Sequence, residues 1–407
     1  MTVRRVLYST LLSAWVGLTL AGRPATGADW PNYRGPDHNG ISKETNWGSD
    51  WGTAGPKVLW QKSIGIGFST TAVADGRAYN MGNSDKKTDT VYCFDAATGQ
   101  ELWKYSYPCP LLPNSYEGGT LSTPTVDGGK VYTLSKVGDL FCFDAAGGKI
   151  LWQKQLNKEM GFELPTWHFA SSAFIPGDML ILNMGSAGLA LNKNNGEVIW
   201  QNGKGKCGYA TPVPFEIDGQ ACLAIMSEVT LFAVKQADGK QLWQYPYKTM
   251  YEINAADPVP VGKQMLITSG YKHGCSLLDI SATEAKKVWE NKVMSMQINC
   301  PIVRDGYAYG FDENIFKCLK LADGSQQWQD KGLGKGSLMA SADGRLMIMS
   351  EKGELVIAKA APQKFDVVAR AQILPQTKCW TSPVLANGRI YARNAVGDFV
   401  CVDVGGK

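Results

Sequence analysis

The fold is decided by the stretch FDAATGQELWKY, residues 94–105, which returns almost unchanged as FDAAGGKILWQK, residues 143–154. A tryptophan closes each copy, and tryptophans at the same place recur along the chain at intervals of 43, 49, 48, 43, 46 and 39 residues. A period in the forties, combined with short segments rich in β-branched and aromatic residues, is typical of a β-propeller. The repeated tryptophans are Trp60, Trp103, Trp152, Trp200, Trp243, Trp289 and Trp328.

A second marker, a tight glycine turn upstream of each tryptophan position, gives an independent count of the blades. Asp-Gly and Asn-Gly supply the positive φ angles that a two-residue hairpin turn requires. The eight turns predict an all-β fold, a single eight-bladed propeller with four-stranded antiparallel blades. They are Asp75–Gly76, Asp127–Gly128, Pro176–Gly177, Asp218–Gly219, Val261–Gly262, Asp305–Gly306, Asp343–Gly344 and Asn387–Gly388.

The two ends of the repeat region complement each other. The last unit stops at GDFVCVDVGGK, residues 397–407, one strand short of a blade, while PKVLWQKSIG, residues 56–65, carries the unpaired first tryptophan. We expect this N-terminal strand to complete the last blade, which closes the ring and removes two sheet edges. The predicted organisation is therefore a leader at 1–28, an N-terminal extension at 29–55 and the propeller at 56–407.

The N-terminus has the pattern of a secretory signal peptide. Arg4 and Arg5 precede the apolar run VLYSTLLSAWVGLTLAG, residues 6–22, and small residues follow it. We expect cleavage after Gly27 or Ala28 and a periplasmic or secreted protein. The alternative is an uncleaved membrane anchor, for which the run is short. No cysteine follows the run, so no lipid anchor is expected.

Composition excludes several classes of partner and site. Without the leader, 38 basic residues face 37 acidic ones, so the chain has no electrostatic footprint for nucleic acid or anionic lipid. No second apolar run reaches membrane-spanning length. The ten cysteines form no CxxC pattern, and those in VYCFD, LFCFD and FVCVD share one repeat position typical of small buried hydrophobes. Whether any pair forms a disulfide is open, and a monomer is expected.

The connections between strands differ between the two faces of the predicted ring. If strands alternate in direction, the short Asp-Gly and Thr-Gly turns share one face, which we call the turn face. The long segments 105–122, 158–171 and 247–257 lie on the other, the irregular-loop face, where we expect the binding site. The alternative is that the aromatic residues there only plug the channel. The predicted ligand-binding residues are Glu117, Trp167, His168, Tyr209, Tyr251, Asn254, Asn299, Lys335 and Trp380, within a wider set that adds Phe68, Cys207, Glu252, Cys300, Lys378 and Cys379.

Several catalytic constellations are missing from the sequence. There is no GxSxG serine elbow, no HExxH and no P-loop, and the three histidines stand far apart with no ligand spacing. The sequence therefore predicts no catalytic residue and no metal ligand.

DAATGQELW and its echoes resemble the tryptophan-docking repeats of the quinoprotein, or PQQ-like repeat, propeller family. The segment DWPNYRGPDHNGIS, residues 29–42, is similar to the N-terminal segment of secreted members. The resemblance covers nearly all of the mature chain and implies the eight-bladed fold. It does not fix a cofactor, because the same repeats occur in members that bind no quinone.

The resemblance leaves two hypotheses for function. In length and blade count the chain resembles BamB, the propeller lipoprotein of the outer-membrane β-barrel assembly machine. That likeness implies a non-catalytic module for a protein or polymer partner on the irregular-loop face, without a cofactor, although the lipid-bearing cysteine is absent. The alternative is a PQQ-dependent dehydrogenase that oxidises an alcohol or sugar. In that case Trp167 or Trp380 could stack on the quinone, and Glu117, Asn254 or Asn299 could face calcium. The adjacent cysteine pair of the alcohol-oxidising type is absent.

Overall fold

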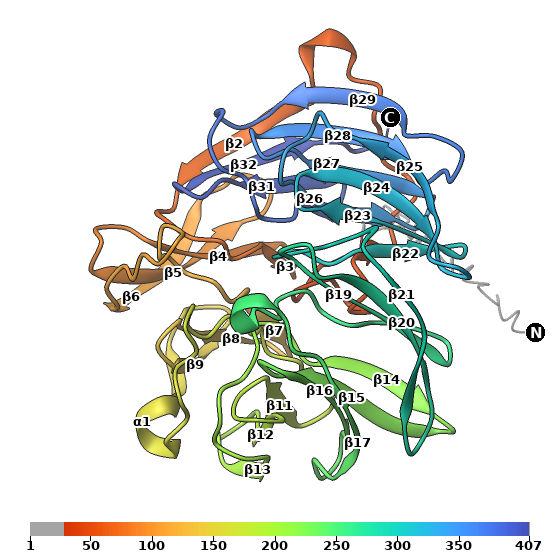
Figure 1. Cartoon of the computed structure of the whole chain (residues 1–407). Coiled ribbons are helices and arrows are strands. Elements are labelled where there is room, and N and C mark those ends of the chain that lie inside the picture. The colour runs from red at the N-terminus through yellow and green to blue at the C-terminus, as the bar shows by residue number, and fades with distance from the viewer. Residues whose placement is uncertain (1–27, 407) are drawn as a thin grey trace, which may run out of the picture.

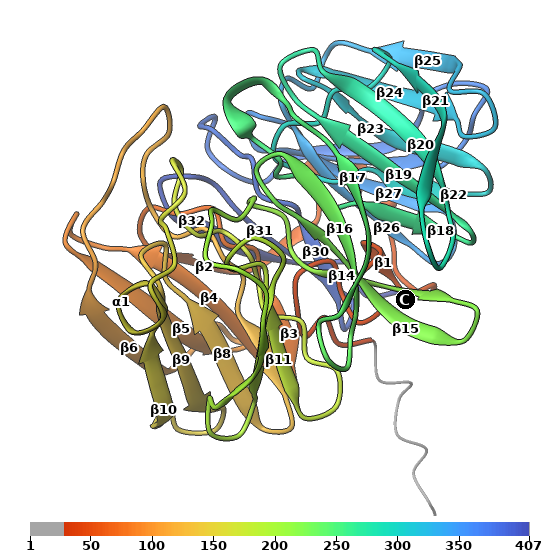
Figure 2. The same ribbon diagram turned by 60° about the horizontal axis from the view of Figure 1, so that its bottom comes forward.

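The computed structural model describes residues 28–406, which form eight β-sheets arranged as the blades of a single propeller (Figures 1 and 2). This confirms the predicted fold class. The predicted leader lies outside the described residues. Within residues 28–406 no helix is long and apolar enough to cross a bilayer, and all ten cysteines are buried with free thiols.

In the first seven blades the chain runs from the central channel outward, and the strands of each blade pair in sequence order. The first blade consists of β3 (Ala72–Ala74), β4 (Arg77–Asn83), β5 (Thr88–Asp95) and β6 (Glu101–Pro108). The second consists of β7 (Thr125–Asp127), β8 (Lys130–Leu134), β9 (Asp139–Asp144) and β10 (Ile150–Gln155), and the fourth of β14 (Val213–Ile217), β15 (Gln220–Met226), β16 (Thr230–Lys235) and β17 (Gln241–Pro246). The fifth consists of β18 (Val259–Val261), β19 (Gln264–Ser269), β20 (Gly274–Ile280) and β21 (Ala285–Asn291), and the sixth of β22 (Ile302–Arg304), β23 (Tyr307–Asp312), β24 (Ile315–Lys320) and β25 (Gln326–Asp330).

Two blades depart from four strands. The third blade has only β11 (Met179–Leu182), β12 (Leu189–Asn192) and β13 (Val198–Gln201), and its innermost position is held by a single bridge from Phe174 to Ile181. The seventh gains a fifth strand, because β1 (Ile41–Ser42) runs parallel to its innermost strand. The seventh blade's own strands are β26 (Ser337–Ser341), β27 (Arg345–Met349), β28 (Glu354–Lys359) and β29 (Asp366–Gln372).

The eighth blade closes the ring as expected. Its inner strands are β30 (Val384–Ala386), β31 (Arg389–Arg393) and β32 (Asp398–Asp403), and its outer strand is β2 (Lys57–Ser63) from the start of the chain. β2 pairs antiparallel with β32, from Lys57 opposite Asp403 to Ser63 opposite Asp398, and the two strands lie side by side in Figures 1 and 2. The closure prediction is thus confirmed.

The repeated motif joins each blade to the next. Trp103 lies on the outer strand of the first blade, and its indole Nε1 donates to the carbonyl of Ala145 in the second blade at 3.0 Å. Its ring lies on Gly148, where a Cβ would stand 2.6 Å from the indole. The repeat therefore pairs a tryptophan with the turn of the following blade. The same donation links Trp60 to Ala96, Trp152 to Lys193, Trp200 to Gln236, Trp243 to Ser281, Trp289 to Leu321 and Trp328 to Ala361.

The predicted glycine turns form close to where the sequence places them, and three are displaced by one residue. Asp75, Asp218, Asp305 and Asn387 adopt positive φ together with the glycine that follows each of them, as a hairpin turn with a right-handed strand twist requires. In the second blade the turn is Gly128–Gly129, one residue later than predicted, because β7 continues through Asp127. In the third and fifth blades the turns are Gly177–Asp178 and Gly262–Lys263, each one residue later than predicted.

Alanine substitutions at two glycines distinguish the energetic cost of disturbing the tryptophan contact from the cost of backbone strain. Gly148 and Gly76 have nearly equal φ, 72° and 73°, but only Gly148 faces a tryptophan, and nothing lies within 4 Å of a Cβ at Gly76. Alanine should cost about 1–2 kcal/mol at either position from the left-handed backbone alone. At Gly148 we expect a further 1–3 kcal/mol or so from overpacking against Trp103. Chemical denaturation of the two variants measures the difference, and equal losses would show that the ring does not need the glycine.

The N-terminal extension lies along the inner strands, around the channel. Trp30 bridges Val73 of the first blade, the carbonyl of Pro31 accepts from Val126 of the second, and β1 pairs with β26 of the seventh. Three short helices lie outside the blades: η1 (Gly52–Ala54) in the extension, α1 (Leu156–Met160) after β10 and η2 (Met250–Glu252) after β17. The extension is thereby part of the wall of the channel.

Candidate functional site

A cavity of about 210 Å³ opens on the irregular-loop face, at the mouth of the central channel. Its walls come from the loops that lead into the innermost strands. Seven aromatic side chains line it, and they come from six blades and from the N-terminal extension. They are Tyr33, Phe68, Tyr116, Trp167, Tyr209, Tyr271 and Trp380.

Four of the nine predicted ligand-binding residues line this cavity: Trp167, Tyr209, Asn299 and Trp380. The two indoles belong to loops before the third and eighth blades, and the cavity lies between them. Their ligand-binding role stays a prediction, but the loops do converge on a hollow.

Trp167 and Tyr209 form one side of the cavity. Their rings meet edge to face at 6.2 Å between centroids, and the Tyr209 hydroxyl accepts from the backbone N–H of Trp167 at 3.3 Å. The Trp167 Nε1 donates to the carbonyl of Asn114 at 3.1 Å. Burial raises the pKa of Tyr209 above its ordinary value, so the phenol stays protonated. The loops are thus fixed to one another before any ligand binds.

Trp380 forms the other side and gathers charged neighbours at the rim. Its Nε1 donates to Glu351 Oε1 at 3.1 Å, and the ammonium groups of Lys378 and Lys335 lie 4.3 and 5.3 Å from its ring centroid. Lys378 is paired with Glu117 at 2.7 Å. Glu117 and Lys335, both predicted ligand residues, therefore stand at the rim and do not line the cavity.

Three further predicted residues stand outside the cavity for different reasons. Asn254 is 1% exposed, and its amide donates to the carbonyls of Ser227, Glu228 and Tyr247, which holds it in the loop structure. Tyr251 is 62% exposed and packs on Tyr271. The His168 ring contacts the Tyr116 hydroxyl at 3.5 Å, and its pKa is lowered by burial and by nearby Lys136.

A belt of hydrogen bonds runs around the channel at the level of the cavity. In each of five successive blades, the backbone N–H of a residue just before the innermost strand donates to the short polar side chain at the same place in the next blade. This belt ties six blades together and fixes the lower wall of the cavity. The bonds run from Thr70 to Thr123 (3.0 Å), Thr123 to Ser172 (2.9 Å), Ser172 to Thr211 (3.2 Å), Thr211 to Asp257 (2.8 Å) and Asp257 to Cys300 (3.1 Å).

The floor of the cavity combines the belt with the N-terminal extension. Tyr33 lines the cavity and its hydroxyl lies 3.7 Å from Cys300 Sγ, while Arg34 Nε lies 3.9 Å from Asp257 Oδ2. Burial raises the pKa of Asp257 to about 6, against the opposing effect of Arg34. Burial also raises the pKa of Cys300 to about 11, so this thiol stays protonated.

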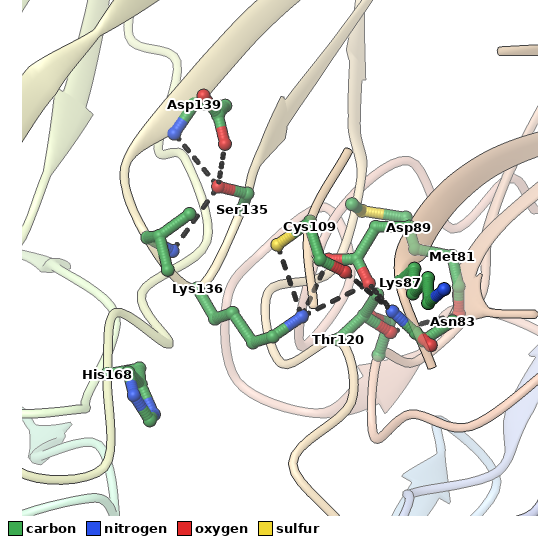
Figure 3. Close-up of polar contacts among 12 residues, drawn as sticks. Met81, Asn83, Lys87, Asp89, Cys109, Thr120, Ser135, Lys136, Asp139 and His168 are labelled. Atoms are coloured by element: carbon green, nitrogen blue, oxygen red, sulfur yellow. Dashed lines mark hydrogen bonds and ion pairs between the residues drawn. The ribbon is translucent and has the colours of Figure 1, made fainter. Parts of the chain in front are cut away.

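A buried ion pair supports the wall from behind (Figure 3). Lys136, in the hairpin between β8 and β9, donates to both oxygens of Asp89 at 3.1 and 2.9 Å and to Cys109 Sγ at 3.2 Å, and both charged side chains are fully buried. Asn83 donates to Asp89 and to the carbonyl of Cys109. Cys109 begins the loop that carries Tyr116, so this cluster anchors the loop across the seam between the first and second blades.

Sequence reasoning missed Tyr33, Tyr271 and Asp257 as lining residues. Tyr33 lies in the extension, and Tyr271 lies in the short hairpin between β19 and β20. Neither belongs to the long segments 105–122, 158–171 and 247–257, from which the binding site was predicted. Asp257 had a usable signal: it stands before a proline at the start of an innermost strand, as do Thr123, Thr211 and Cys300. That repeat position defines the belt.

The described lining carries few charged groups. Within residues 28–406, no group of three or more His, Cys, Asp or Glu side chains could hold a metal ion. Among the described residues that line the cavity, Asp257 is the only charged one. The site is thus a rigid aromatic hollow with one carboxylate at its floor.

Comparison with known proteins identifies the type of propeller. A family model described as outer membrane protein assembly factor BamB matches residues 45–201 and 87–330. No curated protein gives a significant sequence match to the chain.

Solved structures resemble the chain in fold. The crystal structure of BamB from Moraxella catarrhalis is 15% identical, with a TM-score of 0.63, and the match covers 86% of this chain and 99% of that one. A europium-containing methanol dehydrogenase is 12% identical, with a TM-score of 0.69 and coverage of 91% and 90%. The quinohemoprotein alcohol dehydrogenase from Comamonas testosteroni is 13% identical, with a TM-score of 0.67 and coverage of 93% and 81%. At these identities the likeness extends to the fold alone.

Proposed function

Because the chain belongs to the family described as outer membrane protein assembly factor BamB, we propose that it is a non-catalytic propeller that binds a protein partner through its irregular-loop face. The observation that carries the proposal is the convergence of aromatic side chains from six blades on one rigid hollow. Tryptophan and tyrosine dominate binding energy at protein interfaces, because they bury large areas with little loss of entropy.

The turn face is a poorer candidate for specific binding. Its hairpins are committed to turn geometry and present similar short residues. Five of its turn glycines receive docking tryptophans, and the glycines of six other turns have no neighbour within 4 Å of a Cβ. The irregular-loop face, by contrast, varies from blade to blade. Variety of side chains is what specific recognition requires.

A quinone enzyme is the second candidate, because structures of similar fold include alcohol and methanol dehydrogenases. PQQ is a planar tricarboxylate and needs cationic side chains, and its calcium needs several oxygen ligands. The lining has one carboxylate, Asp257, and no lysine or arginine among the described residues. The nearest lysines at the rim, Lys378 and Lys335, are paired with acidic residues. These residues do not fit the cofactor, and we assign no step to it. Dye reduction after incubation with PQQ, calcium and an alcohol tests this assignment.

We expect the double variant Trp167→Ala/Trp380→Ala to weaken partner binding by more than about tenfold, since each indole is a candidate hot spot. The fold should be retained, because neither residue is a docking tryptophan. The matched control is Asn387→Ala on the turn face, which should leave binding unchanged.

The measurement uses the full chain with a photo-crosslinker at exposed Tyr251 or, for comparison, at Asp218 on the turn face. The protein captured only from Tyr251 is then purified and its affinity measured for each variant. Capture from Asp218 alone, or loss of binding in Asn387→Ala, would show that the partner binds the turn face and would contradict the proposal. A polysaccharide recovered in place of a protein would change the partner class.

Location and assembly belong to the same proposal. Four statements remain predictions: the protein is exported through the leader, it lies outside the cytoplasm, it carries no lipid anchor, and it is a monomer. Mass spectrometry of the mature N-terminus in a cell fraction tests the first three.

A further inference from the structure

Several polar side chains that line the cavity are hydrogen-bonded within the protein. Gln297 donates to the Tyr271 hydroxyl at 2.7 Å and accepts from Lys335, and Asn299 donates to the carbonyl of Gly336 at 3.1 Å. Among the lining groups, the hydroxyl of Thr381 is an exception, buried without a partner. The polar lining is therefore partly committed to the protein itself.

What the cavity does offer is aromatic surface. The Nε1 atoms of Trp167 and Trp380 are already used, by Asn114 and Glu351, so the rings contribute their π-electron faces. The electron-rich faces of aromatic rings attract cations, most strongly when water is excluded. Trp380 already holds two ammonium groups of the chain itself, those of Lys378 and Lys335.

The charges at the site also favour a cation. Asp257 is the one charged side chain among the described lining residues, and Arg34 approaches it only at 3.9 Å from below. Around Trp380, the carboxylates of Glu117, Glu313 and Glu351 face the ammonium groups of Lys335 and Lys378. Each ammonium group at this rim is therefore paired with a carboxylate, and neither lysine is free to bind a carboxylate ligand.

We propose that the cavity binds an organic ammonium group, held by the aromatic walls and by the carboxylate of Asp257. This inference rests on the proposed binding function of the irregular-loop face and names the chemistry that the hollow recognises. The group could be a lysine side chain of a protein partner or the head of a free quaternary ammonium compound. Both carry a positive charge that an aromatic face attracts; the quaternary head has no N–H donor, whereas the lysine ammonium has three, for which the Asp257 carboxylate is an acceptor.

The decisive test compares ligands on the unmodified full chain. Choline, butylammonium and 3,3-dimethyl-1-butanol, the neutral carbon isostere of choline, are titrated at constant ionic strength, with tryptophan fluorescence and ligand-observed NMR as readouts. We expect choline to bind about tenfold more tightly than the neutral alcohol. Butylammonium tighter than choline points to a partner's lysine, and the reverse order points to a quaternary ammonium compound.

A double variant tests whether the Asp257 carboxylate contributes to the preference for a cation. Arg34→Gln/Asp257→Asn removes both floor charges together, so no buried charge is left alone, and should weaken choline binding about tenfold while leaving the neutral alcohol unchanged. Equal or tighter binding of the neutral alcohol to the unmodified chain overturns the inference. If that binding disappears in Trp167→Ala/Trp380→Ala, the hollow is still a binding site. No binding of either ammonium probe also overturns the inference, while the crosslinking result decides the docking face separately.

Discussion

Replacing Trp103 by alanine is expected to lower the free energy of unfolding by about 3–5 kcal/mol, as is typical when a buried aromatic site is emptied. The indole is only 8% exposed, packs near Tyr79 and Phe143, and donates to Ala145 of the next blade. Its loss leaves a cavity at a seam between blades and removes one of the two donors to the Ala145 carbonyl, the other being the Tyr79 hydroxyl at 3.3 Å. Urea denaturation followed by circular dichroism measures the shift in midpoint.

Trp167→Ala is the matched control, because this tryptophan lines the cavity and docks no blade. It should change the midpoint far less than Trp103→Ala does. An unchanged midpoint for Trp103→Ala would show that the docking contact contributes nothing to stability.

The second large effect is expected at the buried ion pair. Lys136→Met leaves the carboxylate of Asp89 buried without its cation, and we expect a loss of about 3–5 kcal/mol. The single variant should denature at a markedly lower urea concentration. Because the pair anchors the loop that carries Tyr116, hydrogen exchange in that loop should also accelerate.

Two comparisons separate the buried charge from simple loss of packing. The double variant Lys136→Met/Asp89→Leu removes both charges and should recover most of the lost stability. At the exposed pair of Lys263 and Asp218, Lys263→Met should change stability by less than about 1 kcal/mol. If Lys136→Met proved as harmless as Lys263→Met, Asp89 would not be a buried charge that depends on Lys136.

The fold could be predicted because its rules are local and repeated. Seven seams share one rule, in which a tryptophan on the outer strand donates to the turn of the following blade. In five of them the ring also lies on a turn glycine, as Trp103 lies on Gly148. The prediction of four strands was wrong for the third blade. Its turn and its tryptophan are present, but its inner strand is reduced to the bridge at Phe174. The glycine turns predict the number of blades, but they do not predict how many hydrogen bonds the inner strand of each blade forms.

The site could be predicted only in part, because a ring brings together residues that have no common spacing. Trp167 and Trp380 stood out as aromatic residues in irregular loops, and they do line the cavity. Asn254 had the same sequence context, but three carbonyls of its own neighbourhood bind its amide. The position of Tyr33 could not be predicted, because no sequence pattern in the extension indicates that its side chain reaches the floor of the cavity.

The pairing of β2 with β32 has a consequence for the order in which the protein can fold. Lys57–Ser63 is made early, whereas its partner Asp398–Asp403 is among the last residues to be synthesised. The entropy of closing so long a loop grows only slowly with length, but contacts this distant in sequence form late. Trp60 on β2 meanwhile can dock on Ala96 and Gly99 of the first blade, which are nearby in the chain. A growing chain can therefore hold its first strand in place while it waits for the last. Until that strand arrives, the unfinished ring exposes a sheet edge, and this is the stage at which a chain of this design is most open to aggregation.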